Sequence, residues 1–273
     1  MKKFLAIILT VALIVAVFAG CSGAKEGGET AADAGKALKV GFDMDGFEPF
    51  GYKDDKGEWT GFDLDLAAEV VKLIDGYDSI ELVPINWDTK DEEMKNGSVD
   101  IIWNGFTIEG REDDYEWTKP YMKNAQVIVV SENSGINSKA DLKDKVVGTQ
   151  KGSSGLDAIN SDEELLSLIK DGKAMEFDGY ETALLELQQG SMDALVIDEQ
   201  VISVKIANGE VEGYKILDDK LSEESYGVAA KKGNTELVSQ IEAVLDTLAE
   251  QGKVKELSEK YFGYDATVWA EEK

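Results

Sequence analysis

The stretch WNGFTIEGRED, Trp103 to Asp113, follows the apolar run of a strand and passes through Gly105 into a polar loop. Residues 99–104, VDIIWN, have the character of a buried strand, and the glycine indicates where it ends. Arg111 then stands among acidic neighbours, in a chain with 55 acidic residues, 28 basic residues and no histidine. Such an arginine is either a solvated surface ion pair or a binding group for a carboxylate.

Strand-like and helix-like segments alternate along residues 38–263. Apolar runs typical of strands occupy 38–42, 80–85, 99–104, 125–130, 145–150, 174–177, 193–197 and 226–232. Helical patterns occupy 61–74, 91–97, 153–170, 180–189, 234–250 and 253–261. This alternation predicts an α/β fold in which mostly parallel sheets are covered by helices. The roughly 236 residues that follow position 37 are enough for two lobes.

The N-terminus has the pattern of a secretory signal. Two lysines precede an apolar run from Phe4 to Ala19, which is shorter than the roughly twenty residues that span a bilayer. Gly20 and Cys21 follow, and Cys21 is the single cysteine of the chain. We expect residues 1–20 to be a signal peptide, Cys21 to be lipidated, and 21–37 to be a flexible tether. The alternative is an ordinary signal peptide with a chance cysteine.

The composition argues against several classes of function. Removal of Lys2 and Lys3 leaves 26 basic against 55 acidic residues, a net charge of −29, which repels nucleic acid and anionic membranes. With neither histidine nor a free thiol, we expect no metal site and no disulfide. The glycines near position 152 lack the spacing of a phosphate-binding Walker loop, and we expect no cofactor.

The loops at the carboxyl ends of the predicted strands are the candidate binding positions, because open α/β sheets bind ligands there. These loops cover residues 43–48, 86–88, 104–111, 150–154 and 197–200.

Aromatic residues occupy two of these loops. Phe47 and Trp87 are either core residues or the walls of a slot, since aromatic faces hold aliphatic and cationic side chains. Trp103 and Phe106 have the character of strand or core residues.

The loops of the second half carry hydroxyl and carboxylate groups. Gly152, Ser153 and Ser154 follow a strand and open a helix, a place where backbone N–H groups bind an anion or where a serine caps the helix. Asp198 closes the strand ALVID and is either a helix-start carboxylate or an acceptor for an ammonium group.

The succession of motifs resembles the polar amino-acid substrate-binding proteins of ABC importers, the bacterial extracellular solute-binding proteins of family 3, which have the two-lobed type II periplasmic-binding-protein fold. The resemblance covers essentially all of residues 38–263. The motifs, in order, are FEPFGYKDDKGEWTGFDLDLAAEV (47–70), GSVDIIWNGFTIEGRE (97–112), TKPYM (118–122), VVGTQKGSSG (146–155), GSMDALVIDE (190–199), SYGVAAKK (225–232) and KYFG (260–263).

This resemblance implies roles for residues of the first lobe. Phe47 and Trp87 match the aromatics that flank the ligand side chain. Gly105 and Thr107 match residues that hydrogen-bond the ligand, and Arg111 matches the arginine that binds the α-carboxylate. Arg111 then serves as the carboxylate-binding group rather than as a surface ion pair.

In the second lobe, Ser153 and Ser154 match the helix start that also contacts the carboxylate, and Asp198 matches the acceptor of the α-ammonium. A zwitterion enters a closed cleft only when both charges are paired, because desolvating an unpaired charge costs several kcal/mol.

The ligand side chain is less clearly predicted. An acid that senses a cationic side chain is either Asp43 or Asp45, whereas Asn104 suits glutamine or another polar side chain. We expect a basic or polar amino acid.

The expected lobes are residues 38–129 with 225–273, and residues 130–224. The chain crosses between them near 129–131 and 224–227. The ligand favours the closed state because its contacts are complete only when the lobes shut.

The resemblance further implies a monomer outside the cytoplasmic membrane that delivers its ligand to a membrane permease. Two alternatives stay open. The same fold hosts dehydratases that act on small carboxylates, and it also occurs in ligand-sensing ectodomains, although no transmembrane segment follows residue 263 in the sequence given.

Overall fold

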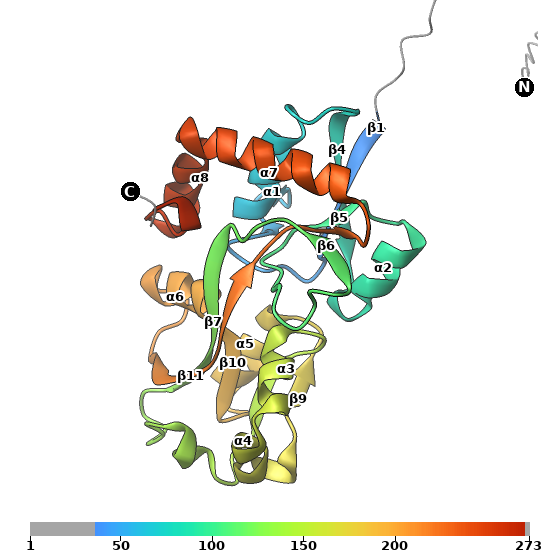
Figure 1. The fold of residues 1–273 in the computed structure, drawn as a ribbon. Helices are drawn as coiled ribbons and strands as arrows, with labels where there is room; N and C mark the ends of the chain where they lie inside the picture. The colour runs from blue at the N-terminus through green and yellow to red at the C-terminus, as the bar shows by residue number, and fades with distance from the viewer. Residues whose placement is uncertain (1–35, 271–273) are drawn as a thin grey trace, which may run out of the picture. The chain divides into compact units, whose positions relative to one another are not determined.

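Residues 36–270 are described here from a computed structural model (Figure 1), and they belong to one compact unit. The expected signal peptide, Cys21 and residues 22–35 lie outside the described residues. The last two residues of the expected tether, Lys36 and Ala37, instead begin the first strand, because their backbone pairs with Tyr77 and Ser79.

The first sheet has five strands in the order β4-β1-β5-β12-β6. Its strands are β1 (Lys36–Asp43), β4 (Tyr77–Ile85), β5 (Ile101–Ile102), β6 (Tyr115–Trp117) and β12 (Ala229–Lys231). β1 runs parallel to β4 and β5, whereas β12 is antiparallel to β5 and β6.

The second sheet also has five strands, in the order β11-β7-β10-β8-β9. Its strands are β7 (Met122–Ser131), β8 (Val147–Gln150), β9 (Met175–Phe177), β10 (Ala194–Asp198) and β11 (Tyr214–Tyr226). β8 is parallel to β9 and β10, and β7 is antiparallel to β10 and β11. Both sheets are therefore mixed, with more antiparallel pairing than the sequence led us to expect.

Helices cover these sheets, and the α/β fold class is confirmed. The α-helices are α1 (Phe62–Val70), α2 (Lys90–Asn96), α3 (Ser154–Ser161), α4 (Glu163–Leu168), α5 (Tyr180–Gln189), α6 (Glu199–Ala207), α7 (Thr235–Glu250) and α8 (Lys253–Phe262). Single 3₁₀ turns occupy Trp87–Thr89, Lys139–Leu142, Lys170–Gly172 and Val268–Ala270, and β2 (Tyr52–Lys53) pairs with β3 (Trp59–Thr60) in a small hairpin. Among the described residues, none of the helices is long and apolar enough to cross a membrane.

Alternate residues of the central strands pack into different parts of the core. In β7, Val127 and Val129 join the large cluster that contacts both sheets, while Ile128 and Val130 join a smaller cluster on the opposite face of the second sheet. This two-residue period is the period of a pleated strand with both faces covered. Burial on both faces explains why the sequences of these strands are continuous apolar runs.

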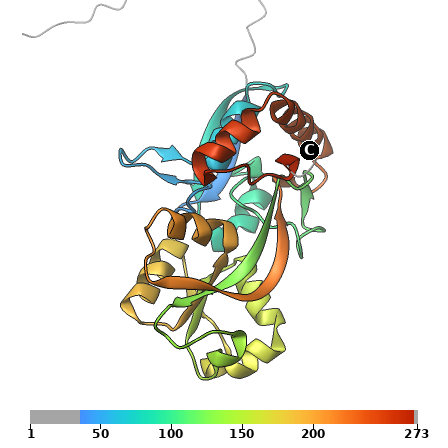
Figure 2. The same cartoon turned by 90° about the vertical axis from the view of Figure 1, so that its left-hand side faces the viewer.

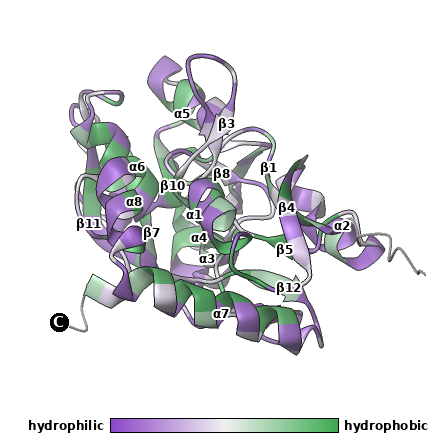
Figure 3. Cartoon of the chain, turned by 90° about the horizontal axis from the view of Figure 1, so that it is seen from above, coloured by the Kyte–Doolittle hydropathy of each residue, from purple (hydrophilic) through white to green (hydrophobic). Residues whose placement is uncertain are grey.

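The covering helices are amphipathic. In α7 the buried residues lie on one face, with the adjacent pair Leu237 and Val238 followed at spacings of three or four by Ile241, Leu245 and Leu248. Figure 3 shows hydrophobic and hydrophilic residues mixed along this helix.

Two long strands connect the sheets. β7 and β11 lie side by side over most of their length, from Met122 opposite Tyr226 to Ser131 opposite Tyr214 (Figure 2). At one end Tyr226 bridges to Thr107, in the loop that follows β5 of the first sheet. The sequence patterns indicated β7 but missed β11, and they offered α6 only as one of two alternatives, a helix that starts at Asp198.

Candidate functional site

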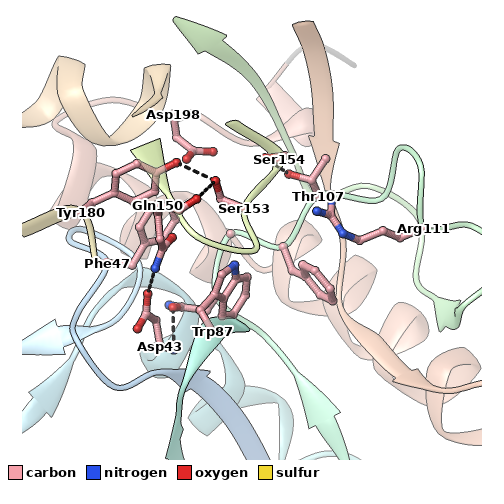
Figure 4. A pocket seen from close by; sticks show the side chains of 13 residues that line it. Asp43, Phe47, Trp87, Thr107, Arg111, Gln150, Ser153, Ser154, Tyr180 and Asp198 are labelled. Atoms are coloured by element: carbon pink, nitrogen blue, oxygen red, sulfur yellow. Dashed lines mark hydrogen bonds between the residues drawn. The ribbon is translucent and has the colours of Figure 1, made fainter. Parts of the chain in front are cut away.

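Loops at the carboxyl ends of strands from both sheets meet around one cavity (Figure 4). The cavity contains about 320 Å³ of empty space, part of it open to solvent. Its lining residues are Asp43, Phe47, Trp87, Asn104, Gly105, Phe106, Thr107, Arg111, Gln150, Ser153, Ser154, Tyr180 and Asp198. We call the residues numbered 43–111 the first wall and those numbered 150–198 the second wall.

The first wall begins with Asp43, the last residue of β1. Its side chain is 2% exposed, and its Oδ1 accepts a hydrogen bond from the backbone of Asp45 at 3.0 Å. Burial raises the pKa of Asp43 to about 6, although the hydrogen bonds from Asp45 and Gln150 oppose the shift. Asn104 fixes the strand end, because its Oδ1 accepts from the backbone N–H of Asp43 at 3.0 Å.

A buried carboxylate holds the glycine of the first wall. The backbone N–H of Gly105 donates to Asp63 Oδ2 at 2.6 Å, and the hydroxyl of Tyr121 donates to the same oxygen at 2.8 Å. Asp63 is fully buried, and burial raises its pKa to about 7. Gly105 has φ +55, and a Cβ there would lie 2.7 Å from a ring carbon of Phe47. Glycine therefore permits the close approach of Phe47 to the loop.

Three aromatic rings of the first wall line the cavity and belong to the core at the same time. Trp87 packs edge-on against Phe106 with ring centroids 5.3 Å apart. The ring centroid of Phe47 lies 5.7 Å from that of Tyr180 in the second wall. The core and slot interpretations of Phe47 and Trp87 are thus compatible. We interpreted Phe106 as a core residue only, and it also faces the cavity.

Arg111 lies where the first wall meets the second. Its side chain is 13% exposed, its Nη2 donates to Asp157 Oδ2 at 2.6 Å, and its guanidinium lies 5.6 Å from the centre of the Phe106 ring. Asp157 is 67% exposed, so this ion pair is open to solvent. Arg111 therefore forms an ion pair and also lines the cavity, and its role as a carboxylate-binding group stays a prediction.

The second wall contains the start of α3. Ser153 caps this helix, since its Oγ accepts from the backbone N–H of Leu156 at 3.2 Å and donates to the carbonyl of Gln150 at 2.7 Å. Ser154 is the first residue of the helix, and its hydroxyl accepts a hydrogen bond from Thr107 at 3.2 Å. The serine cap is therefore present, and the N-terminal end of the helix also faces the cavity.

Asp198 ends β10 and is almost fully buried. Its Oδ1 accepts from Asn124 Nδ2 at 2.7 Å, from Gln126 Nε2 at 2.9 Å and from the hydroxyl of Tyr226. Its side chain does not cap α6, which begins at the next residue. Burial, reinforced by the neighbouring Glu224 carboxylate, raises the pKa of Asp198 well above its usual range.

The two walls touch each other around the cavity. Gln150 Nε2 donates to Asp43 Oδ2 at 2.5 Å, and Lys90 Nζ donates to the carbonyl of Gly152 at 2.8 Å. Burial lowers the pKa of Lys90 to about 8, and the nearby positive charge of Arg111 lowers it by a smaller amount. The structure therefore describes the walls in contact rather than apart.

Ion pairs reinforce this contact. Lys151 pairs with Asp88 at 2.7 Å, and Lys205 pairs with Glu48 at 3.3 Å.

Ten of the twelve predicted ligand-binding residues line the cavity. Asp45 does not: it is exposed, and its Cβ is close to Gly179. Gly152 does not either, because it faces Asp88 and Lys90. Sequence reasoning missed Gln150 and Tyr180, which carried no signal beyond lying in, or near, a strand-end loop.

Within residues 36–270, no group of three or more acidic, histidine or cysteine side chains is arranged to hold a metal ion.

Residues 38–264 match the family described as bacterial extracellular solute-binding proteins, family 3. The match covers most of the chain, and the chain belongs to this family. The resemblance seen in the sequence motifs is thereby confirmed, together with the type II periplasmic-binding-protein fold.

Relatives of known name support this assignment. A probable histidine-binding protein of Neisseria gonorrhoeae is 30% identical over 266 residues, which cover 96% of each chain. An ABC uptake transporter substrate-binding protein of Streptococcus pneumoniae, solved with bound histidine, is 32% identical with a TM-score of 0.80 over 85% of this chain and 94% of that one. An ancestral arginine-binding protein bound to glutamine is 34% identical with a TM-score of 0.74, over 83% and 98%. All three are described as binding proteins.

Proposed function

We propose that this protein is a receptor that binds a free L-amino acid in the cavity and delivers it to the permease of an ABC importer. The observation that carries the proposal is that one cavity is lined by both a guanidinium, that of Arg111, and a buried carboxylate, that of Asp198. A free amino acid carries one carboxylate and one ammonium group, and both charges need partners when they leave water.

The carboxylate end of the ligand would contact Arg111, Thr107 and Ser154. A guanidinium binds a carboxylate through two parallel hydrogen bonds, and the start of α3 adds partial positive charge. The ammonium group would contact Asp198, whose carboxylate lies at the end of β10.

The side chain of the ligand would extend toward Asp43 and Gln150. Figure 4 shows these two residues on the opposite side of the cavity from Arg111. A buried carboxylate favours a cationic side chain, and the amide of Gln150 suits a polar one. We therefore propose a basic or polar amino acid, with Asp43 rather than Asp45 as the sensing acid. The histidine, arginine and glutamine in the names of the relatives belong to the same chemical range.

The two sheets would form the cores of two lobes, which the sequence placed at residues 38–129 with 225–273 and residues 130–224. Because residues 126–129 already pair with β10 of the second sheet, we place the first crossing before Gln126 instead. β7 and β11 would act as the hinge because they connect the sheets. A ligand that contacts both walls stabilises the closed state by its differential affinity for that state.

We further propose that Cys21 is lipidated after removal of residues 1–20, which would anchor the protein outside the cytoplasmic membrane. The variant Cys21→Ala should then leave the membrane fraction, and membrane retention of that variant would refute the anchor.

A thermal-shift screen against the twenty L-amino acids tests the proposed function. A hundredfold excess of ligand over Kd stabilises the native state by about 2.7 kcal/mol. We expect the largest shifts with basic or polar amino acids. If none of the twenty raises the melting temperature, the protein is not an amino-acid receptor.

The variant Asp43→Asn distinguishes the two ends of the ligand. It should reduce the shift given by L-arginine much more than the shift given by L-glutamine, because only arginine carries charge at its far end. An equal reduction would show that Asp43 does not contact the side chain. Asp45→Asn is the matched control and should change neither shift.

A further inference from the structure

A second carboxylate lies next to Asp198. Glu224, near the end of β11, is 5% exposed, and its Oε1 accepts from Asn124 Nδ2 at 2.6 Å and from Gln126 Nε2 at 2.9 Å. The same two nitrogens donate to Asp198 Oδ1 at 2.7 and 2.9 Å. One pair of neutral amides therefore holds two carboxyl groups together in a buried position.

The hydrogen bonds to this pair come from neutral groups. Tyr226 of β11 donates its hydroxyl to Asp198, and Tyr180 of α5 is the other titratable group close to Asp198. From α3, the Ser154 hydroxyl contacts Glu224 at 3.3 Å.

The nearby charged side chains have partners of their own. On α6, Glu199 pairs with Lys220 at 2.8 Å, and across the cavity Arg111 pairs with Asp157. Two like charges in such surroundings cannot both ionise at low cost.

We propose that Glu224 is a positioning residue of the ammonium subsite, which shares one proton with Asp198 until the ammonium group of an amino acid displaces that proton into solvent. This inference rests on the proposed function, because it assigns the ammonium group to Asp198. Asp198 is placed to touch the ligand, whereas Glu224 acts through Asp198 and through the amides that both residues share.

The proton balance of binding follows from this arrangement. Without ligand, the pair holds one proton and one negative charge. The ammonium group arrives with its own three protons and supplies the positive charge that the proton had supplied. The displaced proton goes to solvent, so affinity rises with pH by roughly tenfold per unit over the range in which one proton is released.

Isothermal titration calorimetry measures the released proton directly. The purified protein is titrated with L-arginine and with L-glutamine in phosphate and in Tris at about pH 7.5, where Asp43 is already ionised. The difference in binding enthalpy between the buffers gives the number of protons released. We expect roughly one half to one proton per amino acid for the wild type.

Two neighbouring variants separate the proposed role from a general charge effect. Glu224→Gln should reduce the release severalfold and flatten the pH dependence of affinity, because Asp198 then has no like charge beside it. Glu223→Gln removes the same charge from the preceding residue of β11. Glu223 is exposed, so this variant should behave as the wild type. Absence of proton release by the wild type, or equal release by Glu224→Gln, would overturn the proposal.

A ligand-free measurement separates this proposal from the proposed function. Carboxyl carbon NMR should show Asp198 titrating above its usual range in the wild type and at lower pH in Glu224→Gln. A wild-type Asp198 that titrates at its ordinary value overturns the shared proton even if every amino acid binds. If no amino acid binds, the proposed function fails, and the NMR titration still decides whether the pair holds a proton.

Folding is controlled in the same experiments. Circular dichroism melting of each variant identifies a variant that does not fold. Should Glu224→Gln unfold, Glu224→Asp retains the charge at a longer distance, and the proposal then requires intermediate proton release.

Discussion

The two walls of the cavity are built on different principles. The first wall contributes packed aromatic rings and a guanidinium that is partly open to solvent and already paired with Asp157. The second wall contributes hydroxyl groups and a carboxylate that is held by two amides and a tyrosine in a buried network.

This difference shows where the specificity for charge resides. A buried carboxylate with fixed donors changes position little, so under the proposed function Asp198 would define where the ammonium group binds. Arg111 has a long side chain and an exposed partner, so its guanidinium can adjust as the walls approach each other. Of the two charged groups, Asp198 of the second wall is therefore the more rigidly held, and Arg111 of the first wall is the more adaptable.

The largest effect should come from the rigid wall. Asp198→Asn keeps the size of the side chain and removes the charge that faces the ammonium group, which should weaken amino-acid binding by about 3–5 kcal/mol. Isothermal titration calorimetry against L-arginine and L-glutamine measures the loss. Wild-type affinity in this variant would mean that the ammonium group binds elsewhere.

Arg111→Ala should weaken binding less, by about 2–3 kcal/mol. The guanidinium is partly solvated, so its removal leaves the ligand carboxylate less completely cut off from water. The same titrations measure this effect. A loss larger than that of Asp198→Asn would reverse the comparison of the walls, and unchanged affinity would show that the α-carboxylate does not contact Arg111. Melting curves should show that the variant remains folded.

The first wall depends on the backbone of Gly105. Gly105→Ala should destabilise the protein by about 1–3 kcal/mol, because alanine at φ +55 is strained and its Cβ approaches Phe47 too closely. Urea unfolding measures the change.

Gly110→Ala is the matched control for Gly105. Gly110 has φ +80, and nothing lies within 4 Å of the position that a Cβ would take. Alanine at this position therefore adds backbone strain without a steric clash. Equal destabilisation by the two variants would mean that contact with Phe47 contributes nothing.

Acidification should distinguish ligands by their side chains. The pKa of Asp43 is raised to about 6, and a cationic side chain binds its ionised form, so affinity for L-arginine should fall by up to about tenfold per pH unit below that value. The affinity for L-glutamine does not depend on this charge. The ratio of the two affinities therefore separates the effect of Asp43 from any proton effect that both ligands share. A ratio that stays constant between about pH 5 and pH 7.5 contradicts the assignment.

The smallest effect should come from the exposed partner of Arg111. Asp157→Asn removes an ion pair that is open to solvent, and the change in affinity should stay below about 1 kcal/mol. Calorimetry at two salt concentrations measures it. A loss comparable to that of Arg111→Ala would show that Asp157 fixes the guanidinium, in which case the first wall is as rigid as the second.

The central part of the fold was predictable from sequence for a physical reason. β1, β7 and β10 are buried on both faces, so selection for burial makes them apolar runs that stand out along the chain. The position of the cavity followed from the carboxyl ends of parallel-paired strands such as β1 and β10, which end at Asp43 and Asp198. Ten of the twelve residues expected there line it because strand ends fix the positions of short loops.

The missed parts lack that signal. β11 has the sequence YKILDDKLSEESY, and it lies at the edge of its sheet with irregular pairing between Ile216 and Ser222. Most of its polar residues are therefore exposed or half-buried, and Glu224 is the buried exception. The choice between Asp43 and Asp45 depended on which side of a turn each carboxylate occupies. Spacing alone does not determine that side when both residues are acidic.

Trp87 gives the protein an optical property of its own. Of the residues that line the cavity, Trp87 is the one with an indole ring, and it is 7% exposed in the structure. Indole fluorescence responds to the polarity of its surroundings, and parting of the walls would bring water to this ring. The chain therefore carries an intrinsic fluorophore in the lining of the proposed binding cavity, and its emission should report ligand binding there without an attached dye.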